Sequence, residues 1–157
     1  MSDVPIVRPE DVAATFVEAW NQRDPDALAA LFDDHAEFVN VTGLWWHTRE
    51  EIRKAHAYGL TRIFKESALA ATERPRQTVV GRDRYIVHAR MTLTGQSPVN
   101  DITAPRLRSN VMSFVVRRTT EGWRCASAHN TDVVRGAETN VVDDEGRLRS
   151  VSYRDRH

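Results

Sequence analysis

The chain has 157 residues, with 22 basic and 22 acidic side chains, a single cysteine (Cys125) and no run of 18 apolar residues. This length fits one domain with a substantial core, and the charge balance argues against a nucleic-acid or membrane partner. One cysteine cannot build a disulfide framework, and the N-terminus lacks the apolar core of a signal peptide. We therefore expect a cytoplasmic protein.

Helical spacing dominates the N-terminal part. Residues 1–8 are expected to form a loose arm, and apolar spacing from Pro9 predicts a helix that ends near Gln22. Asp24 is placed to cap a short second helix, which we predict to end near His35.

The next segment begins as a strand. Alternation over residues 38–42 predicts that Phe38 and Asn40 face the interior. Two adjacent tryptophans, Trp45 and Trp46, follow the turn; one would pack in the core and one would rim a pocket, or both would be core residues.

A third helix is predicted from Thr48 to about Glu66. Thr48 and Glu51 form a capping box, in which each side chain satisfies a free backbone N–H group. His56 lies within the apolar stripe of this helix, not opposite it.

After Ser67 the period changes to two, which predicts strands. The predicted strands cover residues 69–72 and 77–80 (one edge strand interrupted at Pro75), 85–94, 108–118 and 123–134. Residues 95–105 predict a long connection, which is either a hairpin end or a lid. Residues 136–157 form a charged tail that is either disordered or a hairpin held by a neighbouring surface such as a second subunit.

Two segments carry a resemblance to a known family. Asn40-Val-Thr-Gly-Leu-Trp-Trp leads into a helix with an internal histidine, and Gly122-Trp-Arg-Cys-Ala-Ser-Ala-His-Asn-Thr closes the domain. With the α+β element order, they resemble the NTF2-like superfamily, and within it the SnoaL-like proteins of the SgcJ/EcaC type, found with natural-product biosynthesis. The resemblance places the domain at residues 9–135.

The resemblance implies a cone-shaped α+β fold, in which a curved antiparallel sheet wraps around three N-terminal helices. It also implies an apolar pocket open at one end and a homodimer formed through the outer sheet face. The residues expected to line or close the cone are Phe16, Trp20, Phe32, Phe38, Phe114 and Trp123.

Three residues are the candidates for catalysis. His56 is placed to act as general acid or base, or is an ordinary hydrogen-bonded core histidine. Asn40 lies where ketosteroid-isomerase-like members have a carboxylate base; its amide cannot take that proton, but it can orient a substrate oxygen or satisfy the backbone. In the last strand we predict that His129 points inward, with Asn130 as the alternative, because a bulge would exchange the two faces.

His88 and Arg90 share one face of their strand. Arg90 would hold a ligand carboxylate or pair with Asp132 inside the cone, or be a solvated charge on the outer face. The residues expected to contact a ligand are Trp20, Phe38, Trp45, Trp46, His88, Arg90, Asn110, Trp123 and Asn130.

No metal, nucleotide, phosphate or serine-hydrolase motif is present, so we expect neither a metal nor a cofactor. The first hypothesis is a cofactor-independent enzyme acting on an apolar, aromatic or polyketide-like metabolite. The alternatives are a protein that sequesters such a metabolite without altering it, and a structural dimerisation module with a filled cone.

Overall fold

Local capping residues account for where the helices begin in the computed structural model, which describes residues 6–154. The helices are α1 (Asp11–Asn21), α2 (Pro25–Ala29) and α3 (Arg49–Leu60). The Asp24 carboxylate accepts a hydrogen bond from the backbone N–H of Ala27 (2.9 Å), and the Thr48 hydroxyl accepts one from that of Glu51 (3.1 Å). The Glu51 carboxylate accepts from the backbone N–H of His47 instead of Thr48, so the predicted capping box is displaced by one residue.

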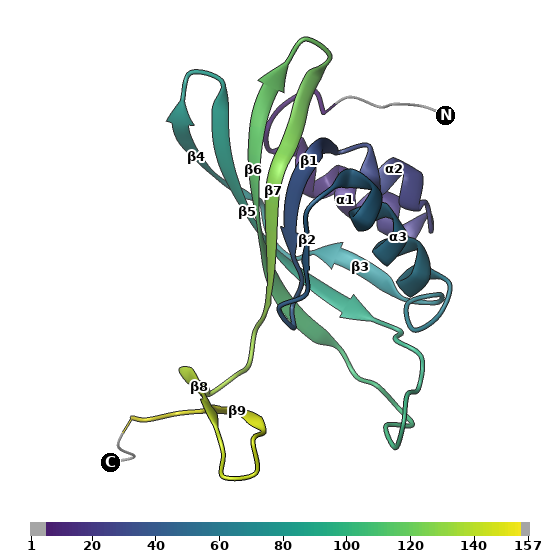
Figure 1. Ribbon diagram of the computed structural model, residues 1–157, viewed down its shortest axis with the longest axis vertical. Coiled ribbons are helices and arrows are strands. Elements are labelled where there is room, and N and C mark those ends of the chain that lie inside the picture. The colour runs from purple at the N-terminus through teal and green to yellow at the C-terminus, as the bar shows by residue number, and fades with distance from the viewer. Residues whose placement is uncertain (1–5, 155–157) are drawn as a thin grey trace.

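The strands form a mixed sheet that curves around the helices (Figure 1). In chain order the strands are β1 (Phe32–Val39), β2 (Trp45–Trp46), β3 (Ala68–Ala71), β4 (Arg76–Gly81), β5 (Arg84–Thr94), β6 (Arg108–Thr119), β7 (Gly122–Asp132), β8 (Thr139–Val142) and β9 (Leu148–Val151). The sheet order is β2-β1-β7-β6-β5-β3, with β4 also paired to β5. The α+β class expected from the order of elements and the curved sheet implied by the resemblance are therefore confirmed. The sheet is not wholly antiparallel as expected, because β1 pairs with β7 in parallel.

The sequence predicted the wrong boundary between the second helix and the first strand. Helix α2 ends at Ala29, and β1 begins at Phe32 instead of Phe38. Phe32 is fully buried and pairs with Cys125 of β7, in a parallel arrangement. Leu31 and Phe32 continue the helical spacing of α2, so long-range pairing overrides the local pattern here. Helix α3 also ends early, at Leu60 instead of near Glu66.

The edge of the sheet follows the prediction of an interrupted strand. Strands β3 and β4 pair one after the other along β5, and the gap between them contains Pro75. Proline cannot donate a ladder hydrogen bond, which explains the break. The connection between β5 and β6 is tethered to the turn after α3, because the backbone N–H of Ser97 donates to the carbonyl of Ile63 (2.8 Å).

A bulge in β7 decides which side chains enter the cone. Val115 of β6 pairs with Ser127 and Val116 pairs with Cys125, so Ala126 is an extra residue in β7. Cys125 and Ala128 are therefore both buried, although they are three positions apart in the strand, whereas His129 is exposed.

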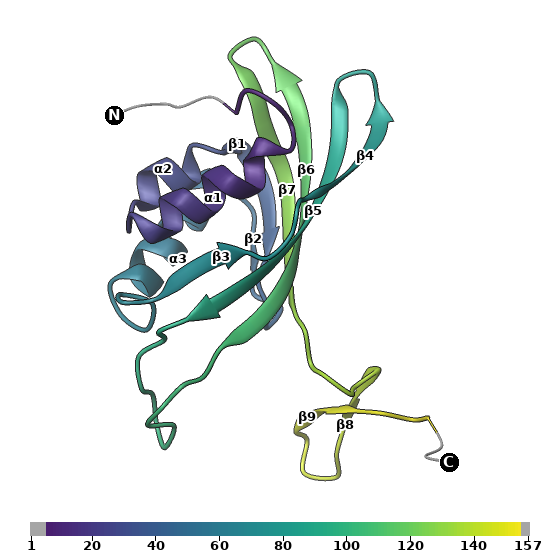
Figure 2. The same ribbon diagram turned by 180° about the vertical axis from the view of Figure 1, so that it is seen from behind.

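All three helices cover one face of the sheet and leave the other face open (Figures 1 and 2). The hairpin of β8 and β9 extends away from the domain at the end of β7. Of the expected N-terminal arm, residues 1–5 lie outside the described part of the chain, and Ile6 is buried in a bridge to Trp123. No helix among the described residues is long and apolar enough to span a membrane.

Candidate functional site

A cavity of about 100 Å³ lies between α3 and the inner face of the sheet. It is lined by Phe16, Trp20, Phe38, Asn40, Val41, Trp46, Ala55, His56, Gly59, Phe64, Arg108 and Asn130. The lining therefore combines aromatic rings and an imidazole with two amides and a guanidinium group. Apolar surface with a few convergent polar groups is typical of small-molecule sites, but such sites usually measure about 300–1,000 Å³, so a ligand larger than one small ring requires the walls of this cavity to move.

His56 lies on α3 with its ring buried among four aromatic side chains. The ring centroids of Phe16, Trp20, Phe38 and Trp46 lie 5.2–6.2 Å from the imidazole centroid, all in edge-on arrangements. The imidazole Nδ1 lies 2.8 Å from the carbonyl oxygen of Ile52, one turn earlier in the helix. Because a carbonyl only accepts, Nδ1 carries the proton, which leaves Nε2 as the acceptor of a side chain that lines the cavity.

The electrostatics of His56 favour the neutral imidazole. Burial lowers its pKa from the ordinary value of 6.5 to about 4, and the hydrogen bond to Ile52 opposes this only in part. At neutral pH the resting side chain therefore accepts a hydrogen bond or a proton through Nε2, and it cannot act as the initial acid.

The aromatic wall depends on a glycine in α3. A β-carbon at Gly59 would lie 3.0 Å from the ring of Phe64, so any other residue here would require this ring to shift. Phe64 in turn lies 4.9 Å from the ring of Trp20, whose indole N–H donates to the hydroxyl of Ser67 (3.0 Å). Trp46 also packs against this core, so the expectation for one tryptophan of the pair holds.

Asn40 lines the cavity, but its carbonyl group is already used. Its Oδ1 accepts hydrogen bonds from the backbone N–H groups of Thr42 (3.0 Å) and Leu44 (2.8 Å) and from the Thr42 hydroxyl. These bonds hold the turn in which Gly43 adopts a positive φ of 88°. Only the amide N–H₂ of Asn40 remains to contact a ligand.

Two further amides lie on the sheet wall. The Asn110 amide N–H₂ of β6 donates to the Asn130 carbonyl of β7 over 2.6 Å. Asn110 is buried behind Asn130 and does not itself line the cavity. Asn130 is therefore held with its own N–H₂ group available, and it replaces His129 as the inward residue of this strand.

Arg108 and Asp132 form a strained polar pair next to these amides. Arg108 Nε and Asp132 Oδ1 lie 3.4 Å apart, and neither atom has a hydrogen-bond partner among the described residues although both are buried. Burial raises the pKa of Asp132, and the charge of Arg108 opposes this rise. Buried polar atoms without hydrogen bonds are costly, and of this pair only Arg108 lines the cavity.

Replacing Arg108 by methionine should lower the free energy of unfolding by about 1–2 kcal/mol at pH 7, because Asp132 loses its counter-charge. The raised pKa of Asp132 implies that the loss shrinks as the pH falls and the carboxylate becomes neutral. Urea unfolding at pH 7 and pH 4 measures both effects. Asp132→Asn is the matched control and should cost less than Arg108→Met; the reverse order would contradict this account.

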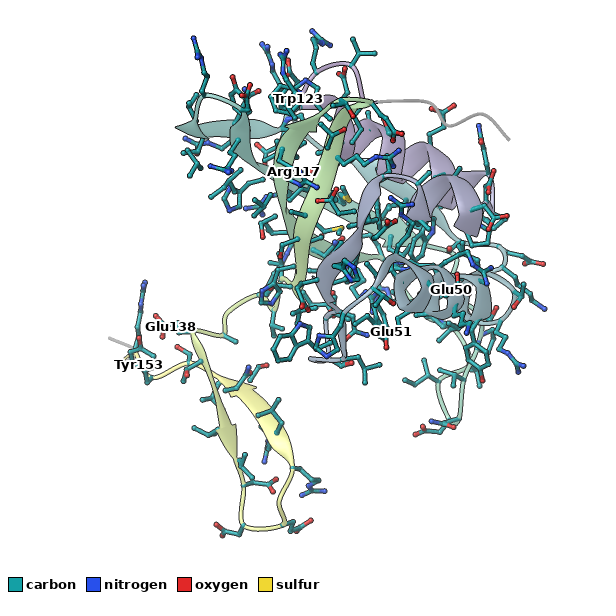
Figure 3. The ribbon with its side chains drawn as sticks, turned by 45° about the horizontal axis from the view of Figure 1, so that its top comes forward. Glu50, Glu51, Arg117, Trp123, Glu138 and Tyr153 are labelled. Carbon is teal, nitrogen blue, oxygen red and sulfur yellow. The ribbon has the colours of Figure 1, made fainter. Side chains whose placement is uncertain are left out.

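Several residues that were predicted to contact a ligand lie outside the cavity, so their predicted positions were wrong. His88 and Arg90 are exposed on the outer face of β5, where Arg90 pairs with Glu73 (3.1 Å) and not with Asp132. Trp45 is exposed and donates to Glu37, and Trp123 packs against Tyr85 at the opposite end of the cone, where Figure 3 labels it. The sheet pleat turns His88 and Arg90 outward. Trp123 is a buried core residue of the inner face, but it lies too far along β7 to line this cavity.

Sequence reasoning missed Arg108 as a site residue, although the signal was present. It lies two residues before Asn110, on the same predicted face of β6. Asp132 was considered only as a partner of Arg90. Its inward position follows from the bulge at Ala126, which the alternation of β7 alone does not reveal.

Other features of the described residues are less suited to small-molecule chemistry. A hollow of about 740 Å³ lies outside the cone, but its arginines are engaged in ion pairs, such as Arg117 with Asp33 and Arg49 with Asp34. Cys125 is buried, its thiol donates to the carbonyl of Ser127, and burial raises its pKa, so it is unsuited to act as a nucleophile. Within residues 6–154 there is no group of three or more potential metal ligands.

Comparison with known proteins gives a consistent picture of the fold. The sequence profile of the SnoaL-like domain matches residues 13–142. An uncharacterized protein with a cystatin-like fold from Caulobacter vibrioides is similar in structure (TM-score 0.71, 21% identity, 79% of this chain and 86% of that chain). An NTF2-like superfamily protein from Salmonella enterica is also similar (TM-score 0.69, 15% identity, 80% and 89%).

A ketosteroid isomerase-like protein from Erwinia carotovora atroseptica shares the fold as well (TM-score 0.60, 16% identity, 80% of this chain and 93% of that chain). No curated protein matches the sequence. At these identities the structural similarities establish the fold alone.

Proposed function

The chain belongs to the SnoaL-like domain family, and from this premise we propose that it is a cofactor-independent enzyme acting on a small, largely apolar molecule in the cone cavity. The observation that carries the proposal is the free Nε2 of His56, held in one tautomer inside a cavity lined by aromatic rings. Natural-product metabolites of the aromatic or polyketide type, as in proteins of the SgcJ/EcaC type, are the proposed substrate class.

The two walls of the cavity suggest the chemistry. His56 offers an acceptor on the helix side, whereas Arg108, Asn130 and Asn40 offer donors on the opposite side. A substrate would place an acidic C–H or O–H against Nε2 and a carbonyl oxygen against the donors. Proton transfer to Nε2 would leave an enolate, whose negative charge the donors stabilise and whose presence offsets the cost of a buried imidazolium. Return of the proton from Nε2 to another carbon of the substrate would complete an isomerisation. Its transfer to a hydroxyl group on the carbon next to the enolate, with cleavage of that C–O bond and release of water, would complete a dehydration.

Binding without reaction is the second candidate function. Asn40 is an amide where a carboxylate base would be needed, and a pKa of about 4 makes His56 a weak base. Both features favour a protein that holds a hydrophobic metabolite unaltered. Recovery of the compound unchanged after long incubation with a saturating amount of protein would support this alternative over the enzyme.

His56→Phe tests the proposed role, because it keeps a ring in the aromatic cluster and removes both nitrogens. We expect turnover to fall by about 10²–10⁴-fold for an enzyme, and affinity alone to fall by about tenfold for a binding protein. A panel of mono- and bicyclic aromatic compounds with hydroxyl and carbonyl groups provides the probes. Their binding can be followed by the fluorescence of Trp20 and Trp46, which line the cavity.

His35→Phe is the matched control, since His35 is exposed and does not line the cavity, and it should leave both quantities unchanged. Equal activity of His56→Phe and the wild type on a bound, converted compound would contradict a catalytic role of His56.

Homodimerisation through the outer sheet face is part of the same proposal. His88, Ser113 and His129 lie in one row across β5, β6 and β7 on this face. The small or β-branched side chains Val111, Ser113 and Val115 make the central strand of the face flat enough to pack against an identical sheet.

A further inference from the structure

The C-terminal hairpin forms a regular element outside the cone. Its ladder runs from the pair Thr139–Val151 to the pair Val142–Leu148, and its strands make their main contacts with each other. Glu138 and Tyr153 lie together at its base, where the Tyr153 backbone N–H donates to the Glu138 carboxylate (Figure 3). The hairpin lies on the side of the sheet that the helices leave uncovered (Figures 1 and 2).

The hairpin carries exposed apolar side chains, which are unfavourable on an element surrounded by water. Val141, Val142, Leu148 and Tyr153 are exposed apolar side chains. An isolated two-stranded hairpin is at best marginally stable in water and needs a third layer against one face. The hairpin therefore has the composition of an element that packs on another surface.

The tip of the hairpin is acidic. The Asp143 carboxylate accepts hydrogen bonds from the backbone N–H groups of Glu145 and Arg147, and these bonds hold the pKa of Asp143 below its usual value. Glu145 pairs with Arg147 within the turn. Asp144 has no partner among the described residues, so the tip presents three carboxylates against one guanidinium group.

The outer sheet face carries a basic hollow of about 270 Å³. It is lined by Glu73, Arg74, Arg76, His88, Ala89, Arg90 and Val111. Arg76 is paired in register with His88, which places both side chains and that of Arg90 on the outer face. This hollow presents three guanidinium groups against one carboxylate, which is the opposite of the hairpin tip.

We propose that the C-terminal hairpin is an arm that packs on the outer sheet face of a second copy of this chain, with its acidic tip at the partner's basic hollow. The tip of the hairpin points away from β4 of its own chain (Figure 1), and β4 contributes Arg76 to the hollow, so the contact joins two chains. In a twofold dimer the contact between acidic tip and basic hollow occurs twice, once for each hairpin, so the assembly is closed. The inference rests on the homodimer proposed above and adds the element that holds it together.

The test is the dimer dissociation constant, measured on the full chain by analytical ultracentrifugation. Wild type should be a dimer, and the double variant Val142→Asp/Leu148→Asp should dissociate about tenfold or more readily. The control Val7→Asp introduces the same charge at a residue that is 75% exposed near the other end of the molecule, and it should remain dimeric. A monomeric wild type would overturn the inference, and so would a double variant as dimeric as the control.

Charge exchange tests the tip contact and separates it from a contact within one chain. Asp144→Arg and Arg76→Asp should each weaken the homodimer by about tenfold, because like charges then meet twice. Mixing the two variants should restore dimer formation to within about threefold of wild type, since every contact in the mixed dimer again joins opposite charges. Failure of the mixture to associate would overturn the proposed docking site.

Ligand binding in the cone, followed by tryptophan fluorescence, provides an independent readout. A sheet-only dimer, in which the arm variants still associate, would refute the arm but leave the proposed function intact. Loss of ligand binding in a dimer that still forms through the arm would refute the proposed function and leave the arm proposal intact.

Discussion

Between pH 7 and pH 4 the wild-type protein should lose about 3 kcal/mol more unfolding free energy than His56→Phe does. In the unfolded chain His56 takes up a proton as the pH falls below about 6.5, whereas burial in the folded protein lowers its pKa to about 4. The unfolded state therefore binds more protons in this window, and stability falls as the pH falls through it. The phenylalanine variant has no titrating group at this position and should not show this loss.

At pH 7 the two proteins should differ by less than about 1 kcal/mol. The carbonyl of Ile52 lies inside α3, where the backbone N–H of residue 56 remains its partner when the imidazole is removed. Urea unfolding at intervals between pH 7 and pH 4 measures the slope. Identical slopes for wild type and His56→Phe would show that His56 is protonated in the folded state.

Phe114→Ala should lower the unfolding free energy by about 3–5 kcal/mol. Phe114 is fully buried on the inner face of β6, and its ring lies 5.8 Å from that of Phe16. Truncation removes the ring from the centre of the cone and leaves a void that helix α1 and the sheet can close only in part. Chemical unfolding at neutral pH gives the value directly.

The neighbouring residue provides the control for this experiment. Val115 lies on the opposite, outer face of β6 and is only half-buried, so Val115→Ala should cost less than about 1 kcal/mol. Comparable losses at the two positions would mean that the inner face of β6 is not the one that supports the cavity.

Much of this architecture follows from short-range patterns. Asp24 and Thr48 start helices where predicted, because capping depends on residues within one turn. The inner face of β6 was also predicted correctly, because alternation runs without interruption through Asn110, Met112 and Phe114. The resemblance to NTF2-like proteins then predicted the cone-shaped fold, and the position of His56 in an apolar stripe indicated which helix faces the inside of the cone.

The remainder of the site was decided by pairing between distant segments. The start of β1 at Phe32 follows from its ladder with β7, and the inward position of Asn130 instead of His129 follows from the register shift at Ala126. Asn110 meets Asn130, and Arg108 meets Asp132, only because β6 and β7 lie side by side. Sequence by itself determined most of the helices and strands, with the start of β1 as the exception, and which face of each uninterrupted element is apolar. The tertiary structure alone decided which polar groups share the cavity, because strand register and bulges depend on contacts far along the chain.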